Sequence, residues 1–123
     1  MIEWAQSLVG RHVDETSAAI KAFRKKPRSA KRLHRARKCL ARLRAVLDDY
    51  GAIAGTSQAF AERIARLHRR AGKVRDADVL LRRARAYKKD AFGTERAELK
   101  RLCALLKKRR KRMRAKLLRE LRA

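Results

Sequence analysis

The 123-residue sequence has little of what interrupts a helix, with one proline and five glycines. No segment alternates apolar and polar residues with the period of two that indicates a strand. No apolar run approaches the ~20 residues that a membrane span needs. The two cysteines, Cys39 and Cys103, lie far apart within helical patterns, so we expect small core residues in a reduced, cytoplasmic protein, without a disulfide or a metal site.

Acidic residues are also scarce. Twelve Asp and Glu stand against 37 Lys and Arg, which gives a formal net charge of +25. Repulsion among these charges opposes a compact fold, and a bound polyanion would relieve it and stabilise the folded state. The alternative is a charged surface that serves only solubility. The composition therefore favours a polyanion as the partner.

Apolar residues recur at helical spacing along the whole chain, so we predict an all-α protein, an antiparallel bundle of four to five amphipathic helices forming a single domain over residues 1–123. The predicted breaks are KKPRS, GAIAGTS, a stop at Gly72 before a new helix from Asp76 to about Lys89, and DAFGT. Four aromatic residues are predicted to be core or near-core: Trp4, Phe23, Phe60 and Phe92. RLHR occurs at 32–35 and 66–69, which we attribute to chance in a chain rich in Arg and Leu.

Within the second predicted helix, cationic side chains lie beside the apolar stripe. A helical wheel places Arg44, Arg37, His34 and Lys38 on one arc next to the stripe. Arginine offers forked donors, lysine a point charge, and histidine a donor whose charge responds to pH near neutrality, and together these suit phosphate oxygens. The alternative is a solvated basic face with a histidine at its boundary.

Two sequence motifs favour phosphate binding over a merely solvated basic face. The pattern His34-x-x-Arg37-Lys38-x-x-x-Arg42-Leu43-Arg44 resembles the signature helix of the CHAD family, the conserved histidine α-helical domains. Downstream, the segment from Gly72 through RDADVLL at 75–81 is similar to a second segment of that family. The resemblance covers roughly residues 15–120 and departs from the family at Ala41, where a basic residue is common, and in having one bundle repeat instead of two.

The resemblance implies a non-catalytic domain that binds inorganic polyphosphate in a basic groove or pore. Combined with the wheel, it gives these candidate polyphosphate-binding residues: Lys31, His34, Arg35, Arg37, Lys38, Arg42, Arg44, Arg75, Lys107, Lys108, Arg110, Lys111 and Arg114. Which basic residues of the last helix face the ligand stays open, as does the orientation of Arg75. We expect Asp76 and Asp78 to cap a helix start, with pairing to Arg37 or Arg44 as the alternative. Lys25 and Lys26 are expected in a linker outside the site.

No nucleophile–base arrangement, metal-ligand spacing or glycine-rich phosphate loop is present, so we expect neither an enzyme nor a cofactor. General binding to RNA or DNA backbones is the main alternative function, because any fold with this charge binds phosphates at low salt. We expect no membrane partner, a cytoplasmic location with association with polyphosphate granules, and a homodimer. The dimer would supply the second bundle through apolar residues of the first and last helices, with Trp4 as an anchor.

Overall fold

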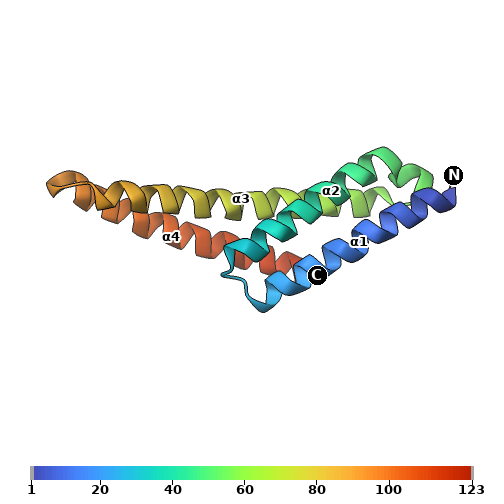
Figure 1. Ribbon diagram of the computed structural model, residues 1–123, viewed down its shortest axis with the longest axis horizontal. Helices are drawn as coiled ribbons and strands as arrows, with labels where there is room; N and C mark the ends of the chain where they lie inside the picture. The colour runs from blue at the N-terminus through green and yellow to red at the C-terminus, as the bar shows by residue number, and fades with distance from the viewer. Residues whose placement is uncertain (1, 123) are drawn as a thin grey trace.

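Four α-helices account for almost all of the chain. The computed structural model describes residues 2–122, which form α1 (Ile2–Lys25), α2 (Ala30–Ala54), α3 (Gln58–Lys89) and α4 (Gly93–Arg122). Each helix packs against the next one in the chain and runs in the opposite direction (Figure 1). The prediction of an all-α antiparallel bundle is therefore confirmed. The α3–α4 hairpin extends well beyond the α1–α2 hairpin, which covers only the half of α3 nearer its start (Figure 1).

Short polar and glycine residues set the ends of α2 and the start of α3. Ser29 caps α2, where its Oγ accepts a hydrogen bond from the Arg32 backbone N at 3.2 Å. Ser57 caps α3 in the same way, accepting from the Phe60 backbone N at 3.2 Å. Gly55 ends α2 with φ of 78°, a left-handed conformation that glycine adopts without steric cost. The predicted breaks at KKPRS, GAIAGTS and DAFGT therefore lie where the helices meet.

The predicted break at Gly72 is wrong, because α3 continues through it to Lys89. The buried residues of α3 keep helical spacing across this position, so burial of one continuous face sustains the helix. A glycine inside a helix costs only about 1 kcal/mol relative to alanine, less than that burial supplies. Asp76 and Asp78 consequently lie in the middle of a helix, and the prediction that they cap a helix start is also wrong.

The core divides into two parts along the long hairpin. The larger part joins all four helices and includes Phe23, which is fully buried, together with Leu33, Leu40, Leu43, Val74 and Leu117. A smaller part holds the far half of the hairpin together through Leu81, Ala84 and Cys103, with Leu106 packed against them. Cys39 is half-buried, Cys103 is buried, and both are free thiols.

Two aromatic residues predicted for the core or its edge are exposed. Phe92 is 85% exposed in the turn between α3 and α4, and Trp4 is 58% exposed near the start of α1. Trp4 meets the ring of Tyr50 edge-on, with ring centroids 5.2 Å apart. Neither position has a further helix packed over it, which the period of the apolar residues alone does not reveal. None of the helices described in residues 2–122 offers an apolar stretch long enough to cross a bilayer.

The continuity of α3 gives a prediction for Gly72. A methyl group there would meet no atom within 4 Å, and the backbone is helical, so Gly72→Ala should stabilise the protein by about 0.5–1 kcal/mol. Gly55→Ala, at φ of 78°, should instead destabilise it by roughly 1–2 kcal/mol. Chemical denaturation measures both. A loss of stability in Gly72→Ala comparable to that in Gly55→Ala would mean that the helix does end at Gly72.

Candidate functional site

A basic groove lies along α2 where it faces α1. This groove, the α2 groove, has a volume of about 850 Å³. The predicted residues Lys31, His34, Arg35, Lys38 and Arg42 all line it. They recur at three- and four-residue spacing, so successive turns of one helix place them along one face. Glu15 of α1 is the one carboxylate that lines the groove, so most of these cations have no acidic partner there.

Another arginine of the α2 groove, Arg32, connects α2 to α1. Its Nη1 donates to the backbone oxygen of Ala22 at 2.7 Å, near the end of α1. The interaction satisfies a carbonyl of the last turn of α1 and places a positive charge where the helix dipole is negative. Arg32 thereby fastens α1 to the beginning of α2 and fixes one wall of the groove.

A second basic groove lies between the α1–α2 turn and α4. This α4 groove, of about 870 Å³, is lined by Lys26, Pro27, Arg28 and Ser29 of the turn and by Lys107, Arg110, Lys111, Arg114, Ala115 and Leu118 of α4. No carboxylate lines it. The structure thus shows which basic residues of α4 gather in a concave surface, a question that the helical wheel leaves open.

The two grooves adjoin at the α1–α2 turn, because Ser29 lines both of them. The turn contributes Lys26 and Arg28 of its own. Lys26 lies in the linker between α1 and α2, as predicted, whereas Lys25 is the last residue of α1. Lys26 also lines the α4 groove, which the sequence did not predict. Eleven lysine and arginine residues, five in the α2 groove and six in the α4 groove, form one basic surface.

Arg110 and Arg114 differ from the other cations of the α4 groove because they are half-buried. Arg110 Nη1 donates to Asp78 Oδ1 of α3 at 3.2 Å. The suggested pairing of Asp78 with Arg37 or Arg44 is thus not what forms. Arg114 Nε is buried without a hydrogen-bond partner among the described residues. Burial lowers the pKa of Arg114 below its ordinary value, and the positive charges of Arg110 and Arg28 lower it further, while Asp78 opposes them. An anion in this groove would satisfy these guanidinium groups.

Arg37 and Arg44 lie on the side of α2 that faces α3. Arg44 Nη1 is 3.3 Å from Nδ1 of His68, a half-buried residue of α3. Burial lowers the pKa of His68, and the charges of Arg44, Arg37 and Arg69 lower it further. Neither Arg37 nor Arg44 lines the α2 groove. The single arc predicted from the wheel is therefore divided between the two sides of α2.

Two further predicted residues, Arg75 and Lys108, line neither groove, as is also true of Arg37 and Arg44. Arg75 is half-buried on α3, about two helical turns beyond His68 and on the same face. Lys108 is exposed on α4 and lines neither groove. Arg75 is thus placed near the Arg37–Arg44 side of α2, while Lys108 is placed on the outer surface.

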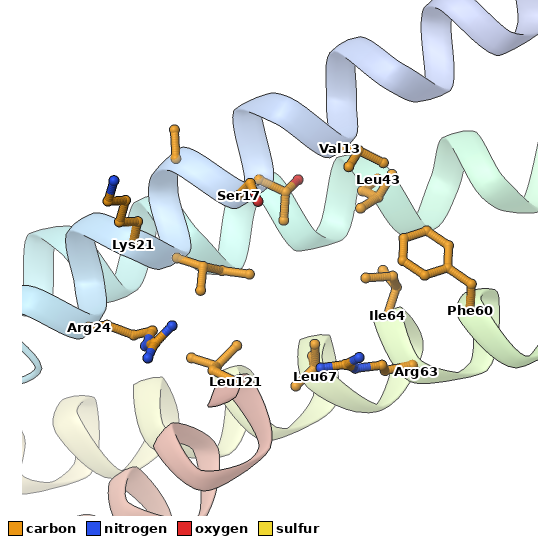
Figure 2. A pocket seen from close by; sticks show the side chains of 13 residues that line it. Val13, Ser17, Lys21, Arg24, Leu43, Phe60, Arg63, Ile64, Leu67 and Leu121 are labelled. Carbon is orange, nitrogen blue, oxygen red and sulfur yellow. The ribbon is translucent and has the colours of Figure 1, made fainter. Parts of the chain in front are cut away.

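A third hollow, of about 550 Å³, is lined by apolar residues together with Lys21, Arg24 and Arg63, and it contains none of the predicted binding residues. It opens between α1 and α3 near the end of α4, where Leu43, Ile64, Leu67 and Leu121 contribute to its walls (Figure 2). It exists because α1 packs on α2 and leaves part of α3 uncovered. Three cations line it, fewer than line either basic groove.

Sequence reasoning missed four residues that the structure brings to these surfaces. Lys26 and Arg28 required knowledge of how the α1–α2 turn folds against α4, and Arg32 required knowledge of how α1 packs on α2. His68 has a sequence signal, the second RLHR, although the repeat of these four letters alone does not distinguish a site from chance. The repeat places Arg69 and His68 on α3 opposite the arginines of α2.

The family model described as the CHAD domain matches residues 7–123, which is nearly the whole chain. No curated protein and no solved structure matches the chain.

Proposed function

Because the chain belongs to the CHAD family, we propose that it binds inorganic polyphosphate, the ligand associated with that family, and carries out no chemistry on it. The observation that supports this proposal most strongly is the joined pair of basic grooves. Eleven lysines and arginines line them against a single carboxylate, Glu15. A surface used only for solubility would mix both signs of charge and would not need to be concave.

The shape of the basic surface suits a linear polyanion. From Lys31 to Arg42 the α2 groove follows about 17 Å of helix, and the turn then leads into the α4 groove. A flexible chain with a negative charge on each phosphate can follow this path and meet cations along its length. Arginine and lysine both contribute, since the first binds two oxygens at once and the second acts as a point charge. His34 lies within the α2 groove as an exposed donor.

General binding to nucleic-acid backbones is the alternative, and the net charge of +25 alone supports it. The exposed aromatic residues argue against a role in reading single-stranded bases. Trp4, Tyr87 and Phe92 are exposed, but none of them lines either basic groove. Base stacking therefore has no platform beside the cations. We propose that contacts to nucleic acid are nonspecific.

We further propose that the protein acts as a homodimer that presents two basic surfaces to one chain. The end of the molecule that contains Trp4 supports this idea, because it is poor in positive charge. Residues 2–16 and 45–62 contain one arginine, Arg11, against six carboxylates. Ile2, Trp4 and Ile53 are exposed there. A contact at this end would bury apolar surface while keeping the cations of the two copies apart, which favours α1 over the strongly basic α4.

The same proposal places the protein in the cytoplasm in association with polyphosphate granules, where its ligand would be concentrated. The two free thiols support a reducing compartment.

Removal of two cations from the α2 groove tests the site. Arg35→Gln with Lys38→Gln should weaken polyphosphate binding about tenfold, because two interactions with phosphate of roughly 0.7 kcal/mol each disappear. Lys100→Gln with Arg101→Gln is the matched control: it also removes one Lys and one Arg, from exposed positions that line neither groove. Fluorescence anisotropy at constant salt would measure both. Equal weakening in the two double variants would show that net charge alone determines binding.

The turn between α1 and α2 gives an independent prediction. Lys26→Gln with Arg28→Gln should weaken binding as much as the α2 double variant does, because both residues line the α4 groove. The dependence of affinity on salt should also become less steep, by about one unit of slope for each cation that no longer meets a phosphate. If the Lys26 and Arg28 double variant bound as tightly as the Lys100 and Arg101 control, the ligand would contact the α2 groove and not the α4 groove.

Assembly can be measured by sedimentation. The free protein should associate more strongly at high salt, which screens repulsion between copies, and polyphosphate should tighten the dimer. Trp4→Ala should weaken association, while Phe92→Ala, at an exposed aromatic residue of the other end, should not. A 14.2 kDa monomer with and without polyphosphate would contradict the dimer.

A further inference from the structure

Arg44 Nη1 lies 3.3 Å from Nδ1 of His68, within hydrogen-bonding distance. A guanidinium group only donates hydrogen bonds, so the partner atom must accept. A hydrogen bond between these two atoms therefore requires an unprotonated Nδ1, with the ring proton on Nε2. Protonating Nδ1 would turn two donors toward each other and end this hydrogen bond.

The charges around His68 all have the same sign. Arg44 and Arg37 act on it from α2, and Arg69 acts on it from α3. The ion pairs that form within residues 2–122 join Arg70 to Glu120 and Arg110 to Asp78, so none of these three arginines is neutralised by one. Burial and the three arginines lower the pKa of His68, which keeps the free ring neutral at pH 7. The cluster is thus a concentration of positive charge without a counter-ion.

We propose that His68, Arg44 and Arg37 form a phosphate-binding subsite on the α3 side of α2, separate from the α2 groove, which takes up a proton when phosphate binds. This inference rests on the proposed function, since it assumes that a phosphate chain reaches α2. The ligand class is a phosphate oxyanion, either one unit of a polyphosphate chain or a short oligophosphate.

Bound phosphate reverses the electrostatics at His68. Its negative charge offsets Arg44, Arg37 and Arg69, so the pKa of the ring rises on binding. Once protonated, the imidazolium donates to a phosphate oxygen. Arg44 no longer has an acceptor at Nδ1 and turns its donors to the same ligand. Arg75, on the same face of α3, extends the cluster along the helix.

The sign of the pH dependence follows by linkage. Because binding raises the pKa, the added affinity is fully present below the pKa of the free protein and is lost as pH rises through the pKa of the complex. Affinity changes about tenfold for each unit by which binding raises that pKa. The ring of His68 should supply this linked proton.

NMR titration of the three histidine rings, free and saturated with a linear polyphosphate of defined length, tests the subsite directly. We expect the free His68 ring to be neutral at pH 7 with its proton on Nε2, and its pKa to rise on saturation. In anisotropy measurements between pH 5.5 and 8, His68→Gln should flatten the pH profile, because glutamine still accepts from Arg44 but does not titrate. His12→Gln, at a histidine that lines neither groove, is the matched control and should retain the slope due to His68.

An unchanged pKa of His68 in the saturated protein, with a slope that survives in His68→Gln, would overturn the subsite and leave polyphosphate binding by the grooves intact. Absence of polyphosphate binding at every pH would overturn the proposed function and the subsite together. The NMR measurement uses the unmodified protein, so its result does not depend on whether a variant folds.

Discussion

Mutual repulsion among the cationic side chains constrains every other feature of this protein. With 37 Lys and Arg against twelve Asp and Glu, most positive charges must remain without an acidic partner. Within residues 2–122 two ion pairs form, Arg70 with Glu120 and Arg110 with Asp78. Long amphipathic helices accommodate this excess, because they bury one apolar stripe and leave most of their circumference to solvated charges. The elongated α3–α4 hairpin spreads the charges further apart than a compact bundle would (Figure 1).

The same constraint produces binding surfaces where helices meet at a turn. The apolar stripe of α2 packs inward, so its cations border the junction with α1 on one side and with α3 on the other. The α1–α2 turn then brings Lys26 and Arg28 against the basic part of α4. The half-buried guanidinium of Arg114 is held beside the positive charges of Arg110 and Arg28, which costs stability in the free protein. A bound polyanion would remove that cost, so ligand binding and folding stability are coupled.

The sequence was sufficient to predict the helical class, three of the connections and the faces of α2. The period of Leu33, Ala36, Leu40 and Leu43 determines which side of α2 is buried, and hence where the cations emerge. The sequence was not sufficient at Gly72. Glycine often ends a helix, but here the burial of one continuous face keeps α3 helical, and that burial depends on tertiary packing. Phe92 was wrongly predicted to lie in or near the core. An apolar residue is buried only where another element packs over it, and no element covers this end of the hairpin. The pairing of Arg44 with His68 joins residues 24 positions apart and depends on the register between α2 and α3.

We propose that the arrangement of the cationic side chains, and not only their number, makes the protein prefer polyphosphate to other polyanions. Competition at about 150 mM salt tests it most directly, since salt at that concentration weakens contacts that depend only on long-range charge. A labelled polyphosphate bound to the protein would be titrated with unlabelled polyphosphate, duplex DNA and RNA at equal phosphate concentration. We expect unlabelled polyphosphate to displace the label at a concentration at least about tenfold lower than either nucleic acid, a preference of about 1.4 kcal/mol. Equal displacement by all three competitors would contradict it and would identify a general binder of phosphate backbones.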